Sequence, residues 1–249
     1  MTTVSARLIE ELSLNAWPAL ETVFLDGWVL RFANDYTRRA NSVNPLYPGA
    51  WALDDKLGQA EELYRRRGLR PVFKITPASE PAGIDQALAE RGYAREAPTS
   101  VQIADLNVAS GPTASGRSTL AEALTDEWLA AAYELIALPE RHRATLRQML
   151  ALIVPPVCFA ALNVDGQTVS CGQGVLQAGC LGLFDIITRG ECRNRGYARQ
   201  VVNDLLARAR EHGGHTAYLQ VMLNNAPALH LYETLGFRET YQYWYRVKG

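Results

Sequence analysis

The stretch "RNRGYA", residues 193–198, places a glycine and a small residue where an apolar strand runs into a helix. The first backbone N–H groups of a helix have no partner within it, and the helix dipole makes this end positive. A phosphate group binds such an end well if side chains leave its approach open, as Gly196 and Ala198 do. We interpret the stretch as a cradle for a pyrophosphate; the alternative is a plain strand-to-helix turn with a solvated basic face.

Basic side chains surround this stretch, which is consistent with an anionic ligand. Four arginines occur within eleven residues, against the single acidic residue Glu191: Arg189, Arg193, Arg195 and Arg199. The stretch contains neither of the two common nucleotide-binding fingerprints, GxxxxGK[ST] and GxGxxG.

A second motif, "NNAPALHLYETLGF" at residues 224–237, follows the next predicted strand. Asn225 can cap a helix through its side chain, and Pro227 fits the first helical turn. Tyr232 lies on the apolar side of this helix, so it is either an ordinary core aromatic or a functional residue. One helix and one strand separate the two motifs, and their combination is much rarer than either motif alone.

The second part of the chain, residues 118–249, predicts an α/β fold with a mixed sheet and helices on both of its faces. Two helices over 126–152, broken near Pro139, precede a hairpin over 157–176 that turns at Asp165-Gly166. A strand over 180–188 follows. The remaining order is helix, strand, helix, strand.

The first part is less regular, but its last four predicted elements repeat this order. "LAERGY" at 88–93 and "YETLGF" at 232–237 stand 144 residues apart, and each ends a helix with Gly followed by an aromatic residue. Such an ending is also a common helix cap, so the repeat is either a duplication or a coincidence. A Gly-, Ser- and Pro-rich segment suggests domains at 1–108 and 118–249 joined by a linker at 109–117.

From about residue 118 to 249 the chain resembles the GCN5-related N-acetyltransferase (GNAT) superfamily. The first motif matches that family's Arg/Gln-x-x-Gly-x-Gly/Ala at Arg193, Gly196 and Ala198. The second matches at Asn225, Ala228, Leu231, Tyr232, Gly236 and Phe237. The resemblance implies a GNAT fold with splayed central strands, in a possible tandem arrangement with a degenerate first domain.

The resemblance also implies a cofactor, acetyl-CoA, and the residues that bind it. The pyrophosphate is expected on the backbone of Arg193, Asn194, Arg195, Gly196, Tyr197 and Ala198. The pantetheine arm is expected to pair with Ile186, Ile187 and Thr188, in an opening between strands 181–188 and 215–222. Asn225 and Tyr232 of the second motif are expected to complete the cofactor site.

Acetyl transfer to an amine needs an oxyanion donor, an acid and a route for the amine proton. The resemblance assigns the donor to a backbone amide near Ile187 and the acid for the departing thiolate to Tyr232. For the base we suggest Asp185, a carboxylate in an otherwise apolar strand whose burial would raise its pKa. Asp185 could instead point outward or bond to the backbone, and a water chain could replace it. Glu191 is the next candidate, although an arginine is its natural partner.

The first part has no counterpart of the pyrophosphate motif before the helix predicted over 54–67. Acidic residues at that helix start suit capping and would repel a pyrophosphate, so this part is expected to have lost cofactor binding. "YTRRANSVNP" at 36–45 either lines the amine site or forms an edge strand kept soluble by Arg38 and Arg39. We favour the edge strand.

Composition limits the partners. A net charge of −1 favours neither nucleic acid nor a membrane surface and weakly favours a small-molecule amine as acceptor. The N-terminus lacks a signal-peptide pattern, no apolar run is long enough to span a membrane, and the cysteines read as reduced thiols, so we expect a cytoplasmic protein. The histidines show no metal-ligand spacing.

We therefore expect an N-acetyltransferase acting on a primary amine without a metal. The alternatives are a protein N-terminal or lysine acetyltransferase and a non-catalytic acyl-CoA-binding or scaffold protein. A homodimer remains open.

Overall fold

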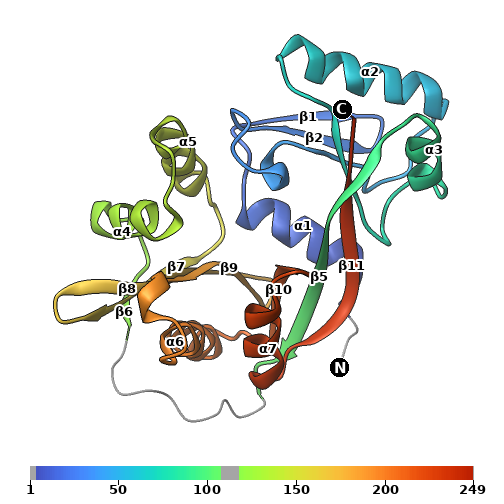
Figure 1. Cartoon of the computed structure of the whole chain (residues 1–249). Coiled ribbons are helices and arrows are strands. Elements are labelled where there is room, and N and C mark those ends of the chain that lie inside the picture. Colours follow the sequence, from blue (N-terminus) through green and yellow to red (C-terminus); the bar gives the residue numbers. More distant parts are fainter. Residues whose placement is uncertain (1–3, 108–117, 249) are drawn as a thin grey trace. The chain divides into compact units, whose positions relative to one another are not determined.

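The computed structural model describes residues 4–107 and 118–248, which form two compact units (Figure 1). The first unit contains residues 1–100 and 241–249, and the second contains residues 101–240. Residues 241–247 of the last strand therefore group with the first unit, unlike in the sequence-based ranges 1–108 and 118–249. The predicted linker 109–117 lies outside the described residues.

The first unit begins with α1 (Ala6–Ala16), whose capping residue Ser5 accepts a bond from the N–H of Leu8. Its strands run in the order β1-β2-β3-β4-β11. The element bounds are β1 Glu21–Leu25, β2 Trp28–Phe32, β3 Val43–Asn44, α2 Leu53–Arg66, β4 Val72–Ile75, α3 Ile84–Glu90 and β11 Arg238–Val247. A buried pair between Glu10 of α1 and Lys74 of β4 (2.5 Å) extends to the hydroxyl of Tyr241 in β11, which donates to Glu10 at 2.7 Å.

The edge-strand prediction for residues 36–45 is wrong. This segment forms a 3-10 helix at Arg38–Ala40 and a strand only at Val43–Asn44, which lies between β2 and β4 rather than at an edge. Arg39 stacks over the ring of Trp17 at 4.7 Å, and Arg38 pairs with Glu96. The two arginines therefore make contacts within the first unit instead of protecting a strand edge.

In the second unit the strands run in the order β5-β10-β9-β8-β7-β6, where residues 101–105 of β5 belong to this unit and residues 94–100 belong to the first. The bounds are β5 Ala94–Asp105, β6 Thr119–Ala121, α4 Asp126–Ile136, α5 Glu140–Ala151, β7 Val157–Val164, β8 Gln167–Gln177, β9 Cys180–Thr188, α6 Tyr197–Glu211, β10 Thr216–Met222 and α7 Ala226–Thr234. The hairpin turns at Asp165 and Gly166, both with positive φ as a two-residue turn requires. β6 was not predicted.

Helices cover both faces of this sheet, as predicted (Figure 1). α6 lies on one face and buries its apolar stripe against the strands: Val201, Val202, Leu205, Leu206 and Ala209. α4 lies on the other face, where Trp128 packs edge-on against Phe159 and donates its indole N–H to the carbonyl of Ala160 at 3.0 Å. No helix in the described ranges is long and apolar enough to cross a membrane.

The repeat seen in the sequence has a structural counterpart. α2-β4-α3-β5 and α6-β10-α7-β11 follow the same order. The helix ends match in detail, because the N–H of Tyr93 bonds to Leu88 and that of Phe237 bonds to Tyr232, both at 3.0 Å. The glycine before each aromatic residue has φ of 82° and 88°. The two parts of the chain thus share an element order and a helix-cap geometry.

Candidate active site

The central strands of the second unit separate partway along their length. β10 pairs in parallel with β9 from Thr216 opposite Cys180 to Leu219 opposite Leu183. β9 then continues to Thr188 and β10 to Met222 without further pairing to each other. The predicted splay is therefore present. On its β10 side, the second half of β9 is left with main-chain groups that a ligand can pair with.

A β-bulge occurs in β9 where the strands part. Cys171 of β8 faces Ile187 and Gln173 faces Phe184, so two residues, Asp185 and Ile186, stand opposite Gly172 alone. Asp185 has a left-handed backbone, with φ of 49°. A bulge interrupts the ladder and redirects backbone groups, which here lie next to Ile187.

The bulge explains why glycine occupies position 172. A Cβ on Gly172 would lie 2.4 Å from Cδ1 of Ile186 and 3.2 Å from Cγ1 of Val201. Its neighbour Gly174 would likewise meet Leu181 and Leu205. The two glycines therefore bring β8 and β9 close to α6.

The stretch 193–198 forms a turn that leads directly into α6, as predicted. Asn194 and Gly196 have left-handed backbones, with φ of 61° and 83°, and the helix begins at Tyr197. The first backbone bond of the helix joins the N–H of Gln200 to the carbonyl of Gly196 at 3.0 Å. Within the described residues no acceptor receives a bond from the N–H groups of 194–199. Six consecutive amides are therefore available at a positive helix end.

The arginines near this turn are not equivalent. Arg193 and Arg195 are exposed, and neither has an ion-pair partner in the parts of the chain that are described. Arg189 is instead held by Glu134 of α4 at 2.7 Å and by the carbonyl of Thr168 at 3.3 Å. Glu191 approaches Arg189 at 4.0 Å, the arginine pairing expected from the sequence. Arg189 thus ties the end of β9 to α4 and is not free to bind a phosphate.

Tyr232 lies on α7, which Asn225 caps by accepting a bond from the N–H of Ala228 at 3.3 Å. Tyr232 packs edge-on against Phe237 at 5.8 Å and is 8% exposed. Burial raises the pKa of its phenol to about 12. Its hydroxyl has no hydrogen-bond partner among the described residues. The phenol is therefore protonated at neutral pH, with its proton uncommitted to the protein.

Asp185 is half-buried at the bulge. Burial raises the pKa of the Cys171 thiol to about 12, and the nearby Asp185 carboxylate contributes to that rise. In the strand register Asp185 stands opposite Gly172, the neighbour of Cys171, one residue before the expected pantetheine-pairing residues. Its role as base stays a prediction.

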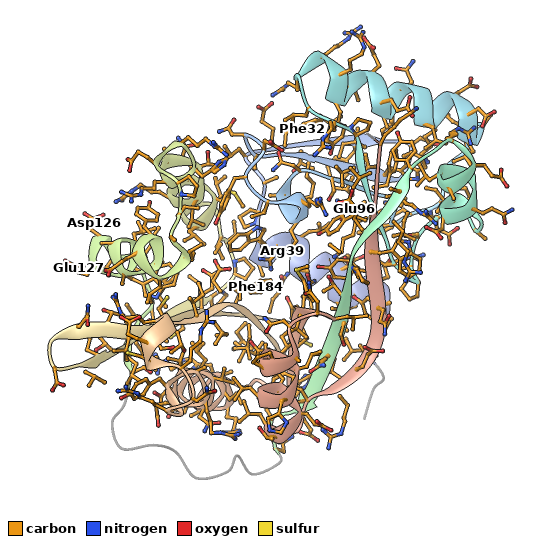
Figure 2. All side chains as sticks on the ribbon, viewed as in Figure 1. Phe32, Arg39, Glu96, Asp126, Glu127 and Phe184 are labelled. Carbon is orange, nitrogen blue, oxygen red and sulfur yellow. The ribbon has the colours of Figure 1, made fainter. Side chains whose placement is uncertain are left out.

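Sequence reasoning missed Gln173, which lies opposite Phe184. Gly172 and Gly174 face α6, so Gln173 between them points to the opposite face, where α4 lies and where Phe184 packs against Tyr218 at 6.2 Å. Figure 2 shows Phe184 there, with Asp126 and Glu127 at the start of α4. Gln173 is fully buried, and neither amide atom bonds to a described residue. The sequence signal that could have identified Gln173 is a glutamine between two glycines in an apolar strand.

The cofactor expected from the sequence fits the residues present. The six free amides and two exposed arginines match the donors that a diphosphate needs. The unpaired half of β9 offers backbone groups to an amide-containing arm. The described residues contain no group of His, Cys, Asp or Glu that could hold a metal ion.

Parted central strands, a bulge at the parting and a glycine turn into the next helix together define the GNAT fold. Solved structures agree: a GCN5-related N-acetyltransferase from Kribbella flavida has a TM-score of 0.75 at 15% identity, covering 99% of this chain and 96% of its own. A tandem GNAT protein from the clavulanic acid biosynthesis pathway has a TM-score of 0.69 at 14% identity, covering 100% and 91%.

The chain belongs to the family described as "Probable histone acetyltransferase Rv0428c C-terminal", whose model matches residues 3–246. It is also 29% identical over 250 residues to the "Uncharacterized N-acetyltransferase YobR" of Bacillus subtilis (strain 168), covering 97% of this chain and 98% of the relative. The protein is therefore an acetyltransferase of the GNAT type.

Proposed function

We propose that the protein transfers the acetyl group of acetyl-CoA to a primary amine of a small molecule, at one active site in the second unit. The main support is the row of six free amides at residues 194–199, at the start of α6. These groups lie on the same unit as the parted strands and the protonated Tyr232.

The proposed chemistry assigns one task to each group. Acetyl-CoA supplies a thioester, and the amides of 194–199 with Arg193 and Arg195 bind its diphosphate. The backbone amide near Ile187 donates to the carbonyl oxygen as the amine nitrogen attacks, and Tyr232 gives its proton to the departing sulfur. Asp185 receives the amine proton, directly or through water.

A small amine is the first candidate acceptor because the net charge of −1 provides no general attraction for a highly charged partner. A lysine side chain of a protein is the second, supported by the word "histone" in the family description. We also propose a cytoplasmic location, where acetyl-CoA and small amines meet.

Thiol release from acetyl-CoA tests the proposal. The panel would contain amino acids, polyamines, aminoglycosides and a lysine-containing peptide, with an amine-free sample as control. We expect at least one small amine to release thiol faster than the peptide. A preference for the peptide would support the second candidate, and CoA binding without turnover of any amine would indicate a non-catalytic binding protein.

Asp185→Asn tests the base. Asparagine tolerates the left-handed backbone at this position, so the variant should fold. We expect kcat at neutral pH to fall about 100-fold, with partial recovery at high pH where the amine is already deprotonated. The matched control is Asp165→Asn, at a hairpin turn with φ of 50°, which should keep wild-type kcat. Unchanged kcat in Asp185→Asn would assign proton removal to another group.

The pH profile tests Tyr232 as acid. The phenol must be protonated to donate, and this form is lost only as pH rises through its pKa of about 12. Because the amine becomes a better nucleophile as it loses its proton, kcat should rise with pH and show no descending limb below about pH 10. A descending limb near pH 8 to 9 would point to a different acid.

A further inference from the structure

The start of α2 in the first unit corresponds to the start of α6 in the second. The two helix caps are 144 residues apart in the sequence. By the same separation, Ala52 corresponds to Gly196 and Lys56 corresponds to Gln200. The first helical bonds agree, because the N–H of Lys56 bonds to Ala52 at 3.1 Å and that of Gln200 bonds to Gly196 at 3.0 Å. The amides of Ala50 and Trp51 are therefore the counterparts of the free amides of Asn194 and Arg195.

In the first unit these two amides already hold an anion, the carboxylate of Asp26. Ala50 donates to Oδ1 at 2.9 Å and Trp51 donates to Oδ2 at 3.0 Å. The ammonium of Lys56 lies 3.1 Å from Oδ2, and the two side chains are only 3% and 14% exposed. The carboxylate thus has two amides and a cation around it, which is the donor set of an oxyanion site.

The loop before α2, residues 49–52, packs tightly against the Asp26 carboxylate. A Cβ on Gly49 would lie 2.1 Å from Oδ2 of Asp26. Ala52 has ψ of 139° in place of the left-handed turn at Gly196, and the first turn of α2 adds Asp54 and Asp55. A diphosphate approaching these amides would find them already bonded to the Asp26 carboxylate. The two further negative charges would repel it.

We infer that Asp26 occupies the anion site of the first unit, so that this half of the chain binds no acyl-CoA and the protein binds one CoA per chain. The inference rests on the proposed function, since it takes residues 194–199 as the site that binds. It gives Asp26 a defined role: the chain's own carboxylate replaces the diphosphate and fastens the β1–β2 turn to α2.

Calorimetry with CoA tests the stoichiometry. We expect one CoA per wild-type chain and none for Gly196→Glu, which closes the site of the second unit. Two CoA per chain, or binding that survives Gly196→Glu, would overturn the inference. The absence of any heat with the wild-type chain would instead overturn the proposed function, so the two failures are distinguishable.

Inorganic pyrophosphate tests the role of Asp26, in the Gly196→Glu background that silences the second unit. Asp26 has φ of 44°, which glycine tolerates, and Asp26→Gly removes both the carboxylate and the volume that it fills. We expect pyrophosphate to raise the Tm of Gly196→Glu/Asp26→Gly but not that of Gly196→Glu or Gly196→Glu/Asp165→Gly. No rise in the Asp26→Gly variant would contradict the inference. If that variant does not fold, the number of CoA molecules bound per wild-type chain tests the inference.

Discussion

Replacing Gly196 by glutamate is expected to abolish CoA binding, with a Kd above about 1 mM. The new side chain would stand among the free amides of 194–199, where it blocks the approach and adds a charge of the same sign as the diphosphate. Because Gly196 has φ of 83°, the variant should also lose about 1 to 2 kcal/mol of folding free energy. Calorimetry and a thermal melt measure the two effects separately.

Gly190→Glu is the matched control for this experiment. Gly190 lies in the same loop, its φ is not left-handed, and a Cβ there meets no atom within 4 Å. The Gly190→Glu substitution introduces the same charge without occupying the turn at Gly196. We therefore expect CoA affinity to stay within about tenfold of wild type. Equal losses in both variants would mean that charge alone, and not the cradle at 194–199, governs binding.

Replacing Tyr232 by phenylalanine is expected to lower kcat about 100-fold or more while changing the Kd for CoA less than threefold. The hydroxyl makes no hydrogen bond to any residue in the described parts of the chain, so its removal leaves no buried partner unsatisfied. The ring keeps its packing against Phe237. We therefore expect a wild-type Tm, and a loss of turnover that reflects the missing proton.

Tyr93→Phe makes the same chemical change in the first unit. The hydroxyl of Tyr93 donates to Glu61 at 2.7 Å, so this variant should lose about 1 kcal/mol of stability and keep its kcat. The two variants thus have opposite expected profiles, one catalytic and one structural. Wild-type kcat in Tyr232→Phe would remove Tyr232 from the mechanism and leave it as a core aromatic residue.

The sequence predicted the parts of the site that depend on local chemistry. The glycine turn into α6, the Asn225 cap and the Asp165-Gly166 hairpin each follow from neighbouring residues, and all three are present. The apolar stripe of α6 is buried, as its periodicity indicated. The separation of β9 and β10 was predicted only from the resemblance to a family, because no local sequence pattern indicates it.

The features that escaped prediction depend on residues far apart in the chain. The bulge at Asp185 exists only relative to the register of β8. The sequence shows Arg189 only as one of four arginines near the turn, whereas its pairing with Glu134, 55 residues away, depends on the fold. The segment 36–45 is polar and contains Arg38 and Arg39, which suit an exposed edge strand, but strand order is a tertiary property.

The exchange of strands between the sequence halves limits how this chain can be divided. A cut between β5 and β6 would leave β4 without Trp244–Val247, the strand residues that pair with it in antiparallel. The same cut would deprive the second fragment of residues 101–105, which cluster with it. Neither fragment would carry all the strand residues of its own unit, so we expect neither fragment to fold as a separate module.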